Sequence, residues 1–175
     1  MQNSKTEVST LLRCGLILTP AQDQAIDKIL SSLMEKIPAQ YILLTDNSGQ
    51  LITFFGKREQ ADPVALGALV ASDLVASQEM SHIMGEYQNY QLILREGPEV
   101  NTWIIDAGMY LVLMFKVSSS VPLGWTRLVI RRAAELIAKI VETPAESTDD
   151  EKQPIFNQEE FTDQIDKSLD ELWQF

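Results

Sequence analysis

The residue types that could do chemistry are few in this chain. His82 is the only histidine and Cys14 the only cysteine, so a Ser-His-Asp or Cys-His site would have to use His82, and a zinc site lacks a second thiol. Asp46 and Asp106 could be imagined as paired carboxylates, but each stands in a turn pattern, which explains them better. No GxxxxGK[ST] or GxGxxG stretch is present. We therefore expect no catalytic residue, no cofactor and no metal site, and a protein that is not an enzyme.

Three arginines raise one further chemical possibility. Arg127, Arg131 and Arg132 lie close together in the sequence, and an arginine finger stabilises the charge that develops during GTP hydrolysis. Residues 122–142 have helical spacing, with Leu123, Arg127, Ile130, Ala134, Ile137 and Val141 along one side and Arg131 and Arg132 largely off it. We favour the solvated surface over a catalytic role.

The elements that would position these residues alternate between helix and strand. Apolar spacing, Pro and Gly punctuation and capping residues predict an N-terminal arm over 1–18, a helix over 19–37, a hairpin of strands over 41–45 and 50–55, a helix over 62–84, strands over 90–95, 101–105 and 109–117, and a helix over 122–142. The three consecutive strands have short connections and form an antiparallel meander. The last of them is apolar at every position from Tyr110 to Phe115, which predicts a central strand covered on both faces.

The helix over 62–84 is rich in small residues. Gly67, Ala68, Ala71, Ser72 and Ala76 stand where a helix of a monomeric core would carry larger side chains. Small side chains let another helix approach closely, and the neighbouring strand over 90–94 is apolar and free of Pro. We expect these two elements to form a subunit interface. The predicted interface residues are Ala65, Ala68, Leu69, Ser72, Ala76, Tyr90, Leu92, Ile93 and Leu94.

Charge divides the chain into a nearly neutral body and an acidic end. The net charge is −11; residues 1–143 hold 12 Lys and Arg against 15 Asp and Glu, and residues 144–175 hold 2 against 10. This balance excludes nucleic-acid binding by phosphate neutralisation. The longest apolar run, within 109–115, is too short to span a membrane, so we expect no membrane insertion. A single cysteine and a start without a signal-peptide pattern favour the cytoplasm.

The acidic end holds one more predicted element. Residues 143–156 are polar, acidic and contain two prolines, which is typical of a linker. Residues 157–175 have an apolar stripe with a negative back, which predicts an amphipathic helix. So short a helix is marginal alone in water, so we expect the stripe to bind a partner. Its residues are Phe161, Ile165, Leu169, Leu172 and Trp173.

Several stretches of this sequence resemble a known family. They are the hairpin over 42–52, the Ala-rich helix, Leu94-Arg95-Glu96-Gly97, and Tyr110 to Leu113 followed by Leu123-Gly124 and Arg131 to Ala134. Across residues 20–142 the chain resembles the Roadblock family of dynein light chains, and most of all its bacterial gliding-protein branch. The resemblance places the Roadblock-like domain at 19–142.

That resemblance carries expectations about fold, assembly and function. It implies an α+β fold, an α/β/α sandwich in which a five-stranded antiparallel sheet has one helix on one face and two on the other. It also implies a homodimer with a continuous ten-stranded sheet, and a small Ras-like GTPase as partner. Two alternatives stay open: a Roadblock-type scaffold or motor-associated adaptor without effect on GTP, and a small-molecule sensor domain.

Overall fold

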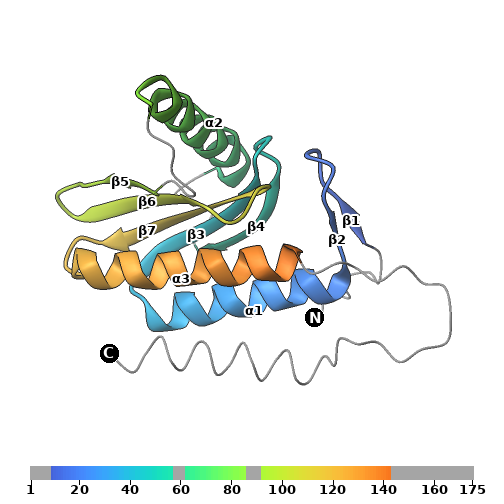
Figure 1. Cartoon of the computed structure of the whole chain (residues 1–175). Helices are drawn as coiled ribbons and strands as arrows, with labels where there is room; N and C mark the ends of the chain where they lie inside the picture. Colours follow the sequence, from blue (N-terminus) through green and yellow to red (C-terminus); the bar gives the residue numbers. More distant parts are fainter. Residues whose placement is uncertain (1–8, 57–61, 86–91, 143–175) are drawn as a thin grey trace, which may run out of the picture.

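The computed structural model describes residues 9–56, 62–85 and 92–142. They form a five-stranded antiparallel sheet with helix α2 on one face and helices α1 and α3 on the other (Figure 1). This confirms the predicted α/β/α sandwich. The predicted linker over 143–156 and the predicted helix over 157–175 lie outside the described residues, and the ten-stranded sheet of a dimer stays a prediction.

The elements follow the chain in the predicted order, preceded by a small hairpin. Their bounds are β1 Thr10–Leu11, β2 Ile17–Leu18, α1 Pro20–Lys36, β3 Ala39–Asp46, β4 Leu51–Gly56, α2 Pro63–Ile83, β5 Leu92–Arg95, β6 Val100–Asp106, β7 Leu111–Ser118 and α3 Leu123–Glu142.

Helix α1 begins where the capping pattern predicts. The Thr19 side chain accepts a hydrogen bond from the backbone N–H of Gln22, and the Gln22 side chain accepts one from the backbone N–H of Thr19. This reciprocal pair satisfies two backbone donors at the start of the helix, and Pro20 occupies the first helical position without needing a hydrogen bond. The helix ends before Pro38, as expected from the sequence.

The sheet has strand order β4-β3-β7-β6-β5, so β7 is central and β4 and β5 are the two edges. All residues from Leu111 to Phe115 are buried, which confirms that both faces of β7 are covered. On the α1 and α3 side the buried cluster includes Ile42, Trp103 and Phe115. A smaller cluster lies between the sheet and α2 and includes Leu43.

The N-terminal arm includes an antiparallel pair, β1 and β2, which the sequence left unassigned. Leu12, which follows β1, and Leu18 of β2 are buried in the same cluster as α1 and α3. The turn of the pair is fastened to the hairpin of β3 and β4, because the Cys14 N–H donates to the Asp46 carboxylate and the Arg13 N–H donates to the side chain of Gln50. Residues 9–18 therefore pack on the body of the protein.

The buried side of α3 differs in part from the predicted stripe. We expected the stripe Leu123, Arg127, Ile130, Ala134, Ile137 and Val141, whereas the structure buries Thr126, Val129, Ile130, Ala133, Ala134, Ile137 and Ile140. Arg127 is exposed. Thr126 can be buried because its hydroxyl donates to the Pro122 carbonyl one turn earlier. Because Thr126 can be buried in this way, it belongs to the buried side of α3, and Arg127 is left facing solvent.

Candidate self-association surface

Asp46 is a buried carboxylate, and its hydrogen bonds account for its burial without a catalytic role. It accepts hydrogen bonds from the hydroxyl and backbone N–H of Ser48, at 2.7 and 2.9 Å, and from the backbone N–H groups of Gln50 and Cys14. Burial raises the pKa of Asp46, but these hydrogen bonds outweigh burial and leave the pKa below its ordinary value. The carboxylate therefore holds the β3–β4 turn and the N-terminal pair together.

The other residues with chemical potential do not meet in one site. Asp46 pairs with Leu111 and Asp106 pairs with Val112, so the two aspartates flank β7 on opposite sides. Neighbouring strands are about 4.8 Å apart, which separates the aspartate backbones by roughly 10 Å. Cys14 is half-buried in the β1–β2 turn. No cluster of three potential metal ligands occurs within the described residues.

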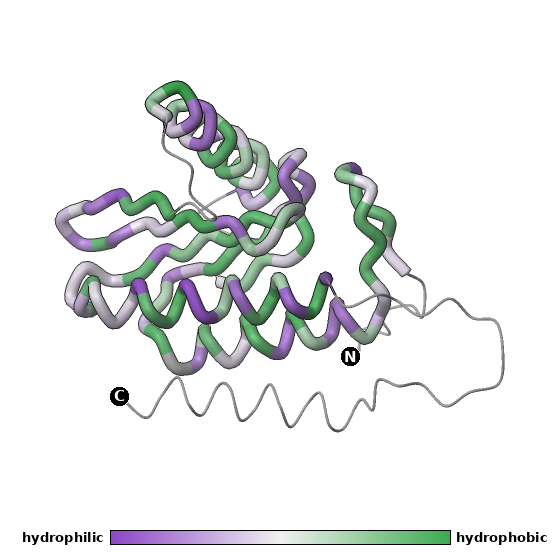
Figure 2. The backbone as a smooth tube through the Cα atoms, in the orientation of Figure 1, coloured by the Kyte–Doolittle hydropathy of each residue, from purple (hydrophilic) through white to green (hydrophobic). Residues whose placement is uncertain are grey.

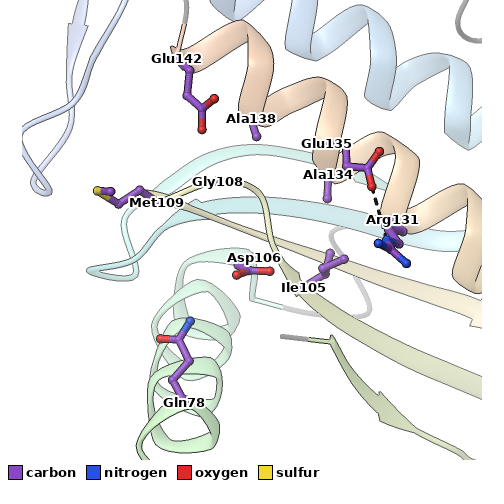
Figure 3. A pocket seen from close by; sticks show the side chains of 10 residues that line it. All are labelled: Gln78, Ile105, Asp106, Gly108, Met109, Arg131, Ala134, Glu135, Ala138 and Glu142. Carbon is purple, nitrogen blue, oxygen red and sulfur yellow. Dashed lines mark ion pairs between the residues drawn. The ribbon is translucent and has the colours of Figure 1, made fainter. Parts of the chain in front are cut away.

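A groove of about 590 Å³ lies between α3, the β6–β7 turn and α2 (Figure 3). Its charged lining includes Arg131 and Glu135, whose ion pair measures 3.4 Å. A Cβ atom on Gly108 would stand 3.1 Å from the Cβ of Ala138 on one side. Ligand pockets of about 300–1,000 Å³ are lined mainly by apolar and aromatic side chains, whereas charged and small residues dominate here. The groove therefore gives the small-molecule sensor hypothesis no specific support.

Helix α2 is positioned at its start by a side-chain cap. The Asp62 carboxylate accepts hydrogen bonds from the backbone N–H groups of Val64 and Ala65, at 3.0 and 3.3 Å, and Pro63 opens the helix. The helix has 21 residues and is therefore about 32 Å long. It covers one face of the sheet alone, so only one of its sides is needed for the core.

Two of the small residues on α2 serve the protein's own core, which corrects part of the sequence interpretation. Gly67 and Ala71 face the sheet and are buried with Val70 and Leu74. A Cβ atom on Gly67 would stand 3.1 Å from the Gly49 carbonyl oxygen. Gly67 is therefore small because α2 lies close to the β3–β4 turn, not because a second subunit approaches it.

The opposite side of α2 is exposed and largely apolar. We call it the α2 outer surface; its apolar and small residues are Val64, Ala65, Ala68, Leu69, Ser72, Val75, Ala76, Met80 and Ile83, and the exposed polar residues Glu79 and His82 lie on the same side. Leu69 is 67% exposed and Ile83 is 81% exposed. Figure 2 shows hydrophobic, intermediate and hydrophilic residues alternating along α2. Contiguous exposed apolar surface of this kind marks an interaction site.

Strand β5 provides an unpaired sheet edge beside this surface. Leu92 and Leu94 pack against the α1 and α3 cluster, and Ile93 packs against the cluster beneath α2. All three are only half-buried. In the described structure β5 pairs with β6 alone, and an exposed edge invites pairing with another strand.

A polar contact joins these two elements. The Arg95 guanidinium, at the end of β5, lies 2.7 Å from an Asp73 carboxylate oxygen on α2. The other Asp73 oxygen is buried and has no hydrogen-bond partner. The sequence analysis missed this pair, although Asp73 stands one turn after Leu69 and next to Ser72. It holds the outer edge of the sheet to the helix that covers it.

The predicted interface residues that the structure describes lie on the exposed side of α2 and on the edge strand β5. The five on α2, Ala65, Ala68, Leu69, Ser72 and Ala76, are exposed, and Leu92, Ile93 and Leu94 form the sheet edge. Ala68 also lies against Gly49 of the β3–β4 turn, so it stands on the flank nearer β4. Their role in an interface stays a prediction. Tyr90 and the predicted partner-binding residues Phe161, Ile165, Leu169, Leu172 and Trp173 lie outside the described residues.

The chain was compared with known proteins by sequence and by structure. The sequence matches no protein-family model and no curated protein sequence. Among solved structures it is similar to Myxococcus xanthus MglB, with 25% identity over 77% of this chain and 100% of that one and a TM-score of 0.67. It is also similar to an MglB with a tetrameric arrangement, with 28% identity over 73% of this chain and 95% of that one and a TM-score of 0.63.

A third solved structure shares the fold at lower identity. It is a Roadblock/LC7 domain from Streptomyces avermitilis, with 14% identity over 65% of this chain and 91% of that one and a TM-score of 0.53. Within the described residues no helix combines the length and apolar character needed to cross a membrane. The chain has a Roadblock-like fold, and its structure is close to that of MglB.

Proposed function

We propose that this protein is a non-enzymatic, homodimeric regulator that binds a small Ras-like GTPase in the cytoplasm and changes its GTP hydrolysis or nucleotide exchange. The observation that carries the proposal is the combination of the α2 outer surface with the free β5 edge. Within residues 9–56, 62–85 and 92–142 the α2 outer surface is exposed and β5 pairs with β6 alone.

Self-association follows from the chemistry of these two elements. Pairing β5 with its copy across a two-fold axis satisfies the backbone groups of the edge and continues the sheet to ten strands. The same axis brings two α2 helices together over the seam. The small residues Ala65, Ser72 and Ala76 are exposed, so they would let the helices approach closely. The tetrameric arrangement named for a similar MglB supports self-association in this fold.

The proposal of a GTPase partner rests on the resemblance to the gliding-protein branch and on the similarity of the fold to MglB. Two α2 helices side by side would offer a broad, mostly apolar docking surface. A regulator without catalytic groups of its own would act by favouring one conformation of the GTPase over another. A Roadblock-type scaffold would use the same surface without changing GTP turnover.

The test mixes the full chain with purified small Ras-like GTPases, each loaded with GDP or with a non-hydrolysable GTP analogue. Binding, GTP hydrolysis and nucleotide release are measured with and without the protein. We expect binding that differs between the two nucleotide states and a change in hydrolysis or release. Equal binding with unchanged GTP kinetics would favour the scaffold, and no binding in either state would contradict both proposals.

A Leu69→Glu chain tests whether GTPase binding requires paired α2 helices, because it places a charge on the α2 outer surface where the two copies would meet. Leu128→Glu is its control, since Leu128 is also an exposed leucine on a helix but lies on α3. We expect the first substitution to abolish GTPase binding and the second to retain it.

A further inference from the structure

The outer side of α3 carries a second unusual surface, on the face of the sheet opposite α2. Its exposed residues over the first three turns are Leu123, Gly124, Arg127, Leu128, Arg131 and Arg132, which we call the α3 basic surface. Arg127 and Arg131 are one turn apart, so their backbones are about 6 Å apart along the helix. Leu128 is 48% exposed among these cations.

Three arginines stand on this surface, and two of them share one carboxylate. Glu135 lies 3.4 Å from Arg131 and 3.6 Å from Arg132, so one carboxylate serves two guanidinium groups. Within residues 9–56, 62–85 and 92–142 no carboxylate lies within 4.0 Å of Arg127. Positive charge around an exposed leucine fits an acidic segment that also carries apolar side chains.

The same chain contains a segment of that chemistry. Residues 144–175 hold 10 Asp and Glu against 2 Lys and Arg. Within 157–175, Asp166 and Asp170 are four residues apart and flank the apolar Leu169. On a helix these carboxylates would be about 6 Å apart along the axis, which matches the spacing of Arg127 and Arg131.

We propose that residues 157–175 dock on the α3 basic surface of their own chain, with Asp166 and Asp170 facing Arg127 and Arg131. The connection is long enough. The 14 residues of 143–156 can span up to roughly 46–50 Å. The distance back along α3 from Glu142 to Arg127 is only about 22 Å.

Residues 157–175 are tethered to the α3 basic surface by the linker, so a weak contact is enough to dock them. Ion pairs between exposed side chains are individually weak, but a short flexible linker gives an effective concentration in the millimolar range. The apolar stripe adds to the attraction by covering exposed apolar side chains on α3. The docked segment would then be withheld from other proteins. Under the proposed function, a GTPase that uses the segment has to displace it from α3 first.

Hydrogen exchange of the full chain, read by mass spectrometry at low ionic strength without any GTPase, tests the docking. Peptides from 157–175 should exchange at least about tenfold more slowly than an unstructured chain. The Arg127→Glu/Arg131→Glu chain should lose this protection, and so should wild type in high salt. Adding Asp166→Arg/Asp170→Arg to the first pair of substitutions should restore it.

The control is Arg13→Glu/Lys139→Glu, which changes the net charge equally but leaves the α3 basic surface intact; it should keep the protection. Peptides from β3 and β7 report whether each variant is folded. Exchange of 157–175 at the rate of an unstructured chain in wild type would overturn the proposal. Unchanged protection in Arg127→Glu/Arg131→Glu would overturn it too, because the segment would then dock elsewhere.

A dilution series identifies the chain that supplies the segment. Docking within one chain predicts the same protection at every protein concentration and in the Leu69→Glu chain. Protection that falls on dilution, or with Leu69→Glu, would show that a second copy supplies the segment and would overturn docking in cis. Because no GTPase is present, failure here leaves the proposed GTPase function untouched.

Discussion

Arg95 on the edge strand β5 and Asp73 on α2 are joined by a 2.7 Å ion pair that fixes the helix over the sheet edge. The two partners differ in their surroundings. The Arg95 side chain is 62% exposed, whereas one oxygen of Asp73 is buried without a hydrogen bond. Removing the arginine leaves a poorly solvated carboxylate, and removing the aspartate leaves an arginine that water can solvate.

Arg95→Ala should therefore destabilise the protein more than Asp73→Ala. We expect a loss of about 0.5–1 kcal/mol for Arg95→Ala, the range of an exposed ion pair. Asp73→Ala should be close to neutral, because alanine favours the helix. Urea unfolding at one fixed protein concentration checks both values. A larger loss for Asp73→Ala would show that the contact does not work in this way.

Gly49→Ala should be strongly destabilising because the β3–β4 turn lies against α2. Gly49 has a φ of +87°, and a Cβ atom there would stand 2.7 Å from the Cα of Ala68. Gly85→Ala is a matched control, since Gly85 has a φ of +76° but nothing within 4 Å of its Cβ position. Both variants incur backbone strain, and we expect Gly49→Ala to lose about 1–3 kcal/mol more in thermal or urea unfolding. Equal losses would mean that the turn and helix do not pack closely.

Asp46→Asn should destabilise the protein in a pH-dependent way. The folded-state pKa of Asp46 is lowered, so the carboxylate contributes stability above its unfolded-state pKa and loses that contribution as the pH falls through the folded-state value. At pH 7 the substitution should cost about 1.5–3 kcal/mol, the range for hydrogen bonds to a charged group. The difference from wild type should shrink in unfolding experiments at increasingly acidic pH. A difference that is the same at neutral and acidic pH would contradict this assignment.

The structural role of Asp46 and the central position of β7 could both be predicted from the sequence. Asp46-Asn47-Ser48-Gly49 is a turn pattern whose chemistry is local, and a strand that is apolar at every position requires cover on both faces. The first turn of α1 was predicted for the same reason, because Thr19 and Pro20 act on their nearest neighbours. Local chemistry can be read from a single sequence.

The features that the sequence interpretation missed or misjudged depend on contacts between segments that are distant in the chain. Gly67 appeared to be one more small residue of an interface, but its size is set by Gly49, which lies 18 positions away. Asp73 and Arg95 are 22 positions apart, and nothing in the pattern links them. On α3, the sequence pattern fits more than one buried side. The structure shows which side is buried, because the Thr126 hydroxyl donates to the Pro122 carbonyl and Thr126 can therefore be buried.

Deleting residues 144–175 should leave the remaining chain folded and associated. The buried clusters of the described residues are formed by α1, α2, α3 and the sheet, so the core does not require the acidic end. We expect the shortened chain to form particles with the same number of chains as the full-length protein. We also expect it to unfold in one cooperative transition. Unfolding of the shortened chain would show that the division at 143 is wrong.

Leu69→Glu should convert the protein to single chains, because it places a charge where two α2 helices would meet. Leu128→Glu is the matched control and should not change the assembly. Sedimentation velocity at several concentrations compares the two variants with wild type. Retention of the wild-type assembly by Leu69→Glu would remove the α2 outer surface from the interface.

The most direct test of the central claim is the mass of the full chain in dilute solution, measured by light scattering after size exclusion. One chain has a mass of 19.7 kDa. Pairing through α2 and β5 predicts a particle of at least twice this mass, which persists on dilution to low micromolar concentration. A particle with the mass of one chain at all concentrations would contradict the account.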